Sequence, residues 1–121
     1  MAYVDGFVLA VEKERLEEYK RFSENSSSFW MDNGATSYVE CVGDDVPNGE
    51  VTSFPRAVQA KENEVVVLAW VTYPSKEVRD ACNAKMMSDP VMNMPGSEMP
   101  FDGKRMFWGG FQPIIERGKG A

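Results

Sequence analysis

The sequence predicts an α+β domain of six elements in the order strand, helix, strand, strand, helix, strand. Two runs, residues 3–11 and 65–73, are apolar on both alternating faces, which is typical of strands in the middle of a sheet. Each run is followed by a stretch in which apolar residues recur every three or four positions, as in an amphipathic helix. The length of 121 residues fits one domain.

The first strand is predicted over residues 3–11, where Asp5 and Gly6 interrupt an otherwise apolar, β-branched and aromatic run. The period then changes, and a helix is expected from residue 12 to Gly34, whose lack of a side chain suits the left-handed end of a helix. The stripe that faces the core consists of Leu16, Tyr19, Phe22, Ser26 and Phe29 or Trp30.

A second strand is expected over residues 36–42, with Glu40 among residues that alternate between two faces. The alternating sets are Tyr38 and Val42 on one side, and Val39 and Cys41 on the other. Residues 43–49 are rich in turn formers, and residues 52–60 indicate a short helix with a serine or threonine cap and a proline in its first turn.

The strongest strand pattern is the continuous apolar run 65–73, which predicts a central strand buried on both faces. Ser75 is then expected to cap a second long helix. The dipeptide Asp89-Pro90 indicates one more short helical turn, followed by a loop over residues 93–100. The last strand is expected over residues 105–111.

This order of elements is that of the split βαβ, or ferredoxin-like, arrangement: a four-stranded antiparallel sheet with two helices on one face. The domain is expected to span residues 1–116, with a flexible tail over 117–121. Because two helices cover only one face, the apolar residues on the other face need a different cover. A second copy of the chain, sheet against sheet, is the most economical one, so we expect a homodimer.

Composition excludes several classes of protein. The net charge of −6 argues against nucleic acid as a partner, since binding to phosphates needs clustered Lys and Arg. The absence of histidine excludes His-based nucleophile systems and His-ligated zinc or haem, so no metal and no cofactor are expected. Two cysteines without a disulfide pattern, no signal peptide and no membrane-spanning run predict a cytoplasmic protein with no membrane contact.

Two acidic residues inside predicted strands, Asp5 and Glu40, are candidates for chemistry. A buried carboxylate is costly unless it is paired or hydrogen-bonded. One interpretation makes either residue a general base with a raised pKa. The structural interpretation, which we favour, gives them ion pairs that hold strand ends together, with Lys104, Arg105 or Arg56 as partners.

The turn Asp102-Gly103-Lys104-Arg105 presents two cations and free backbone amides, which suit a carboxylate or phosphate ligand. It is equally compatible with an ordinary tight turn whose glycine is left-handed. We expect Lys104 to bind a ligand and Arg105, whose guanidinium fork matches a carboxylate, to form a structural ion pair.

Aromatic residues could line a pocket for a flat ligand, although such residues more often form the core. The candidates are Trp70 and Trp108, with Tyr38 and Phe107. Trp108 stands beside Gly109, which leaves space next to its ring. Six methionines between residues 86 and 106 indicate core or interface packing.

The chain also carries a series of short runs that are specific to one family. They are Tyr3-Val4-Asp5-Gly6-Phe7, Val39-Glu40-Cys41, Asp45-Val46-Pro47 with Gly49, residues 73–80, 85–90 and 99–106, and Gly109-Gly110-Phe111. These runs resemble the YbaA-like family of small bacterial proteins, which is defined as a domain of unknown function. The resemblance implies a ferredoxin-like domain that pairs into a dimeric α+β barrel, and it implies no activity.

Two hypotheses of function follow. The first is a protein that binds a small organic molecule in a pocket between sheet and helices, with cofactor-free oxygenase or isomerase chemistry as its enzymatic form. Without histidine, Asp5 or Glu40 would take the proton, and Lys104 or Arg105 would steady the anion that forms. The second is a non-catalytic dimer that serves as a structural or stress-related interaction module. A closed, polar-lined cavity of ligand size favours the first hypothesis and a solid core favours the second.

Overall fold

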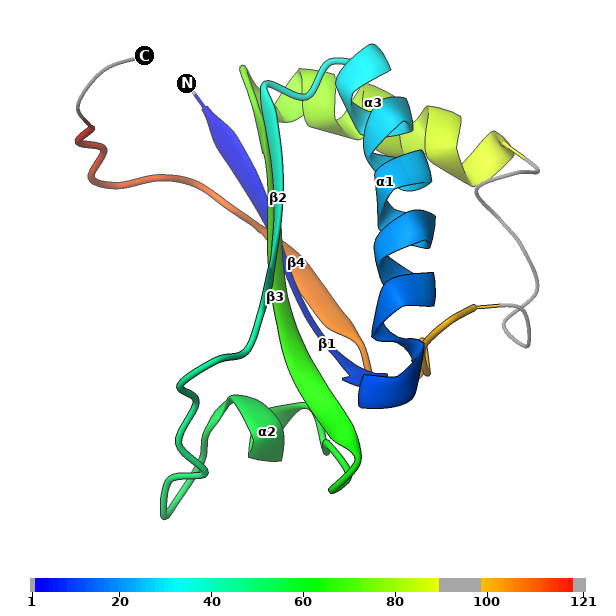
Figure 1. Ribbon diagram of the computed structural model, residues 1–121. Coiled ribbons are helices and arrows are strands. Elements are labelled where there is room, and N and C mark those ends of the chain that lie inside the picture. The colour runs from blue at the N-terminus through cyan, green and yellow to red at the C-terminus, as the bar shows by residue number, and fades with distance from the viewer. Residues whose placement is uncertain (1, 90–98, 119–121) are drawn as a thin grey trace.

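The computed structural model describes residues 2–89 and 99–118 (Figure 1). Its elements are β1 (Tyr3–Glu12), the short 3-10 helix η1 (Lys13–Arg15), α1 (Leu16–Asp32), β2 (Ser37–Val42), α2 (Phe54–Ala57), β3 (Glu64–Tyr73), α3 (Lys76–Ser88) and β4 (Phe107–Phe111). The helical turn expected after Asp89, most of the loop expected over 93–100 and the last three residues of the expected tail lie outside the described residues.

The four strands form one antiparallel sheet in the order β2-β3-β1-β4. The two strands with apolar residues on both faces, β1 and β3, occupy the middle and pair over ten residues, from Tyr3 opposite Tyr73 to Glu12 opposite Glu64. The predicted α+β, ferredoxin-like arrangement is therefore confirmed.

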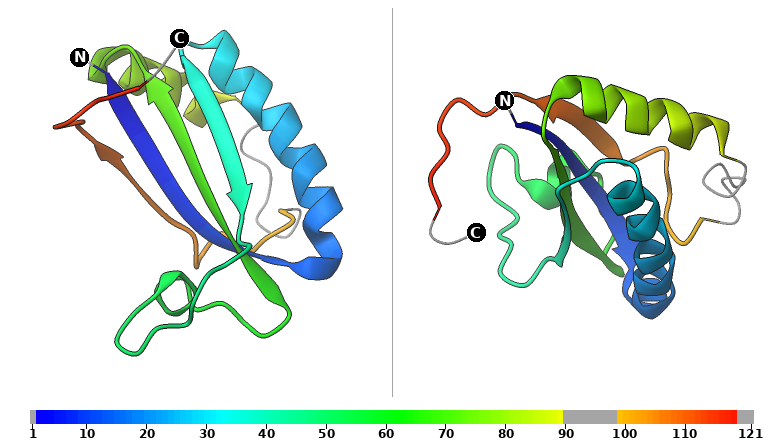
Figure 2. Two further views of the ribbon diagram at one scale, coloured as in Figure 1. Left: turned by 60° about the vertical axis from the view of Figure 1, so that its left-hand side comes forward. Right: turned by 90° about the horizontal axis from the view of Figure 1, so that it is seen from above.

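The long helices α1 and α3 cover one face of the sheet, and the short helix α2 lies on the opposite side (Figures 1 and 2). On the side of the long helices, Leu9 and Val67 from the sheet pack with Tyr19 from α1. Nearby, Tyr73 packs with Cys82 from α3. We call this side the helix face and the other side the outer face.

The element ends follow local chemistry. The Ser75 hydroxyl accepts a hydrogen bond from the Val78 amide at 3.2 Å, which caps α3 as expected. Gly34 has a φ of +111° after α1, in agreement with the left-handed end inferred from the sequence. The helix α1 begins later than predicted because Glu12 still pairs with Glu64 in the sheet.

The outer face is only partly covered. Val8, Ala10 and Val66 pack with Val58 beside α2 at one end of the sheet. On the same face, three apolar side chains are exposed in the single chain: Leu68 at 38 % and Phe107 at 44 %, which both pair with Val8, and Phe111 at 63 %. Trp70 and Cys41 lie on the same face, where Trp70 pairs with Gly6 and Cys41 pairs with Leu68.

Candidate functional site

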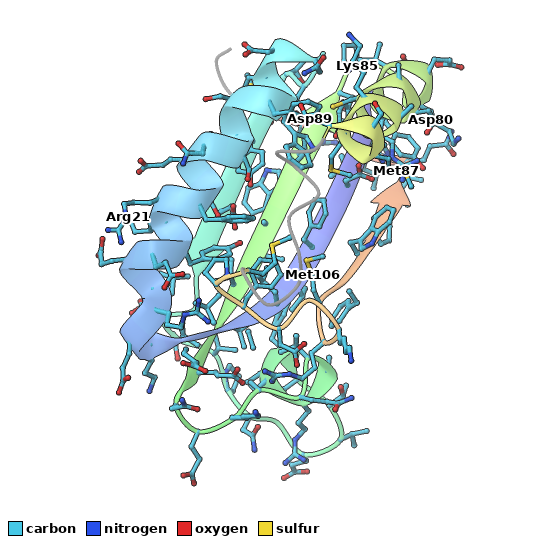
Figure 3. The ribbon with its side chains drawn as sticks, turned by 90° about the vertical axis from the view of Figure 1, so that its right-hand side faces the viewer. Arg21, Asp80, Lys85, Met87, Asp89 and Met106 are labelled. Atoms are coloured by element: carbon cyan, nitrogen blue, oxygen red, sulfur yellow. The ribbon has the colours of Figure 1, made fainter. Side chains whose placement is uncertain are left out.

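A cavity of about 240 Å³ lies on the helix face, between the sheet and helices α1 and α3. The segment 99–106 closes part of it, and Figure 3 shows Met106 of this segment between α1 and β4. Most of the lining is apolar or aromatic. The lining residues are Asp5, Phe7, Leu9, Tyr19, Phe22, Ser23, Ser26, Trp30, Tyr38, Glu40, Ala69, Val71, Asn83, Met86, Met99, Phe101, Met106 and Trp108.

The side chain of Glu40 is a carboxylate in this mostly apolar lining. Its carboxylate accepts a hydrogen bond on Oε2 from the Tyr38 hydroxyl at 2.6 Å. On Oε1 it accepts a second hydrogen bond from the Tyr19 hydroxyl. Tyr38 stands two residues before Glu40 on β2 and therefore shares its face, whereas Tyr19 reaches it from α1. Two neutral phenols, and none of the expected cations, satisfy this carboxylate.

The phenols are held in their protonated form. Burial raises the pKa of Tyr19 and of Tyr38 well above the usual value for a phenol, and the adjacent Glu40 carboxylate raises both further. Each phenol therefore keeps its proton at physiological pH and donates a hydrogen bond to Glu40.

Asp5 has a different partner from those expected. Its side chain is 1 % exposed, and both of its oxygens accept hydrogen bonds from Arg79 Nε at 3.1 Å, while Arg79 Nη2 lies 3.0 Å from Oδ1. Arg79 also pairs with Asp80 at 2.9 Å and lies over the Tyr3 ring. The hydrogen bonds that Arg79 donates to Asp5 raise the pKa of Arg79 above its usual value. Asp5 is thus committed to joining β1 to α3.

The turn after residue 101 holds the cavity segment in place. Arg105 donates to Glu64 at 2.6 and 2.8 Å, to Asp102 at 2.9 Å and to the Gln59 carbonyl at 2.7 Å. The hydrogen bonds from Arg105 lower the pKa of Glu64 below its usual range. Arg105 forms a structural ion pair, with Glu64 as its partner in place of Asp5 or Glu40.

Other members of the turn do not reach the cavity. The Lys104 amide donates to Asp102 Oδ1 at 3.0 Å, and the residue is exposed. Gly103 has no positive φ, and a Cβ there would meet nothing within 4 Å, so the expected left-handed glycine is wrong. The hydrogen bond that the Asp102 carboxylate accepts from the Lys104 amide stabilises the turn in place of a left-handed glycine.

The two tryptophan candidates lie on opposite faces of the sheet. Trp108 lines the cavity at its edge, is 54 % exposed and stacks on Phe7 with ring centroids 6.3 Å apart. Trp70 lies on the outer face and does not line the cavity. The alternation of β3, in which Ala69 and Val71 face the cavity, places Trp70 on the other side.

The sequence interpretation did not assign Tyr19, Arg79 or Phe101 to the site. Tyr19 could have been found, because it belongs to the inner stripe of α1 and Glu40 shares a face with Tyr38. Arg79 could not, because its contact with Asp5 spans 74 residues and depends on how α3 crosses the sheet. Phe101 packs edge-on against Tyr19, at 5.7 Å between centroids, which brings the segment 99–106 over the cavity.

Among residues 2–89 and 99–118, no group of three or more His, Cys, Asp or Glu side chains could hold a metal ion. Both cysteines are free: Cys41 is exposed and Cys82 is buried. Within the described part of the chain, no helix is long and apolar enough to cross a membrane.

Comparison with known sequences gives a family match. A family model described as "Protein of unknown function (DUF1428)" matches residues 2–103. The chain is 53 % identical over 116 residues to the uncharacterized protein YbaA of Escherichia coli K12, a match that covers 96 % of this chain and 99 % of that protein. YbaA of Shigella flexneri matches with the same identity and coverage.

Comparison with solved structures shows the same fold at low sequence identity. SnoaB, a cofactor-independent oxygenase from Streptomyces nogalater solved as a mutant, has a TM-score of 0.63, 10 % identity and 98 % coverage of both chains. Rv0793 from Mycobacterium tuberculosis has a TM-score of 0.59 and 10 % identity, covering 98 % of this chain and 100 % of that one. A dimeric ferredoxin-like protein from an uncultured marine organism has a TM-score of 0.58 and 9 % identity, covering 97 % and 100 %.

Proposed function

The chain belongs to the DUF1428 family of proteins of unknown function, and from this premise we propose that it binds a small ring-shaped organic molecule between the sheet and helices α1 and α3. The cavity of about 240 Å³ carries the proposal. An apolar cavity of about 150 Å³ is already enough to admit benzene. A ligand of one or two rings therefore suits this volume, and the aromatic lining suits its faces.

Glu40 supports an enzymatic form of this proposal. It is a carboxylate at the wall of an apolar cavity, and Asp5, the other candidate base, is committed to Arg79. In an isomerase-type reaction, Glu40 would take a proton from an activated carbon of the ligand and return it to another carbon of the same molecule. That SnoaB is a cofactor-independent oxygenase is consistent with cofactor-free chemistry on this fold, as an analogy between folds.

The proposal includes pairing of two copies through the outer face, in the cytoplasm. The exposed side chains of Leu68, Phe107 and Phe111, beside Trp70, form an apolar surface that α2 leaves open. Apolar residues on a face of this kind need cover, and the dimeric ferredoxin-like neighbour provides a precedent. The two free thiols are in keeping with a reducing compartment.

A ligand screen with a cavity-filling variant tests the proposal. A ligand that binds only the folded state raises the free energy of unfolding, by about 2.7 kcal/mol at a hundred times its dissociation constant. We expect members of a library of one- and two-ring metabolites to raise the melting temperature of the wild-type protein. Ala69→Leu, at the floor of the cavity, should remain folded and lose this response.

Ala84→Leu is the matched control, because it adds the same atoms on the exposed side of α3. It should keep the ligand response of the wild-type protein. If no member of the library shifts the wild-type melting temperature, or if Ala69→Leu responds like Ala84→Leu, the binding proposal fails and the interaction module is favoured.

A further inference from the structure

The hydrogen-bonding capacity of the Glu40 cluster, which we define as Glu40, Tyr19 and Tyr38, restricts what a ligand can offer it. A phenol has one hydrogen to donate, and the hydroxyls of Tyr19 and Tyr38 both donate it in a hydrogen bond to Glu40. A carboxylate has about four lone-pair sites, of which two are used here. Toward the cavity, the cluster therefore presents only acceptors.

The charge of the cavity wall points in the same direction. None of the described lining residues is Lys or Arg. Arg79 lies next to the lining residue Asp5, but its guanidinium is already paired with Asp5 and with Asp80. The wall therefore carries the charge of Glu40 without a free cation to pair with an anionic ligand. In a space lined mostly by apolar groups, repulsion between like charges is larger than in water.

Aromatic rings complete the selection. Trp30, Phe22 and Trp108 line the same cavity as Glu40. Their faces attract flat rings by stacking and cations through the negative face of the ring. A ligand with an apolar ring and a hydrogen-bond donor can use these faces and the acceptors together.

We propose, on the basis of the binding function proposed above, that this cavity selects neutral or cationic ring compounds that donate a hydrogen bond to Glu40, and that it rejects carboxylates and phosphates. Phenols, enols, aromatic amines and arylalkylammonium ions are the ligand classes that meet this requirement. The anion-binding role expected for Lys104 belongs to a different surface, because Lys104 does not line the cavity.

Three matched probes test the selection: naphthol, naphthylmethylamine and naphthoic acid, substituted at the same ring carbon. At neutral pH they present a neutral donor, a cation and an anion on one ring system. In calorimetric titrations of the wild-type protein, naphthol and naphthylmethylamine should bind at least about tenfold more tightly than naphthoate, because each can donate a hydrogen bond to a charged acceptor and naphthoate cannot.

The variant Glu40→Gln replaces a charged acceptor with a neutral group of the same shape that can also donate. Binding of naphthylmethylamine should weaken by about tenfold, and binding of naphthoate should strengthen. Glu24→Gln is the control, since it removes one charge from the exposed side of α1, outside the cavity lining. It should leave the order of the three affinities unchanged.

The outcomes separate the two proposals. If all three probes bind and naphthoate binds as tightly as naphthol, or if Glu40→Gln changes the affinities for naphthylmethylamine and naphthoate no more than Glu24→Gln does, donor selection is overturned and the binding function stands. If none of the three probes binds, the binding function is overturned, and donor selection falls with it.

Discussion

At the scale of single residues, the two glycines Gly34 and Gly103 show how differently the same residue type is constrained. Gly34 combines a φ of +111° with close packing, since a Cβ there would lie 2.5 Å from Val78 Cγ1. Gly103, inside the turn Asp102-Gly103-Lys104-Arg105, has no positive φ and has open space around it. Composition alone ranks them alike, because the need for glycine depends on φ and on neighbours from other elements.

Gly34→Ala should therefore lower the free energy of unfolding by about 1–3 kcal/mol, through backbone strain and the contact with Val78. Gly103→Ala is the matched control and should change it by no more than about 0.5 kcal/mol. Urea unfolding at one fixed protein concentration measures both values. Equal losses for the two variants would contradict this assignment.

Arg105 and Lys104 offer a second comparison between adjacent residues. The Arg105 side chain is 15 % exposed and its partner Glu64 is 4 % exposed, so the pair is well shielded from solvent. Arg105→Ala should lower the free energy of unfolding by about 2–3 kcal/mol at neutral pH, because it leaves Glu64 without its charged partner. Lys104→Ala should cost no more than about 0.5 kcal/mol.

The loss caused by Arg105→Ala should also depend on pH. The pKa of Glu64 is lower in the folded protein than in the unfolded chain, so its contribution is present above the unfolded value of 4.5. It is lost as the pH falls through the lower, folded value. Urea unfolding from about pH 6 to about pH 3 should show the difference between wild type and Arg105→Ala shrinking toward acid. A difference that stays constant would exclude Glu64 as the partner that matters.

At the scale of elements, the ion pair of Asp5 and Arg79 fastens α3 to the middle of the sheet. The strands and helices themselves were predictable, because apolar alternation and helical spacing are local properties. The partner of Asp5 was not, since the sequence contains 13 Lys and Arg residues and only the placement of α3 selects one. The Glu40 cluster was predictable in part: Tyr38 and Glu40 share a face of β2, which the sequence shows, whereas the contact with Tyr19 depends on where α1 packs.

Asp5→Asn should lower the free energy of unfolding by about 3–5 kcal/mol, because it leaves the Arg79 charge mostly buried without its main partner. Asp80→Asn is the control: it touches the same guanidinium from a side chain that is 48 % exposed, so its effect on stability should be much smaller than that of Asp5→Asn. Chemical denaturation of both variants measures the contrast. Similar small losses would indicate that α3 is held by its apolar contacts alone.

At the scale of the whole molecule, the described residues form two features besides the core that matter for function: the cavity on the helix face and the apolar part of the outer face. The sequence indicated the second through strands that are apolar on both faces. It indicated the first only as a set of aromatic and acidic residues, because a cavity is a volume left between elements and has no pattern of its own. The position of the segment 99–106 decides its shape.

Pairing through the outer face predicts a clear effect of charge at its centre. Leu68→Lys should convert a dimer into a monomer in sedimentation experiments, because two copies would then bury unpaired cations. Met87→Lys is the control, since Met87 is 75 % exposed on α3, away from the outer face (Figure 3). It should leave the dimer intact. A wild-type protein that sediments as a monomer at micromolar concentration would contradict the pairing itself.

The two thiols, Cys41 on the outer face and Cys82 beneath α3, would react with an alkylating reagent at rates set by two different motions. In a dimer joined through the outer face, an alkylating reagent would reach Cys41 only in the dissociated monomer. The rate of Cys41 alkylation would then report dimer dissociation, and it should fall as the protein concentration rises. Burial raises the pKa of the Cys82 thiol, and that thiol is reached only when the layer beneath α3 opens. A single time course of alkylation would thus measure two processes: dissociation of the dimer and local unfolding within one chain.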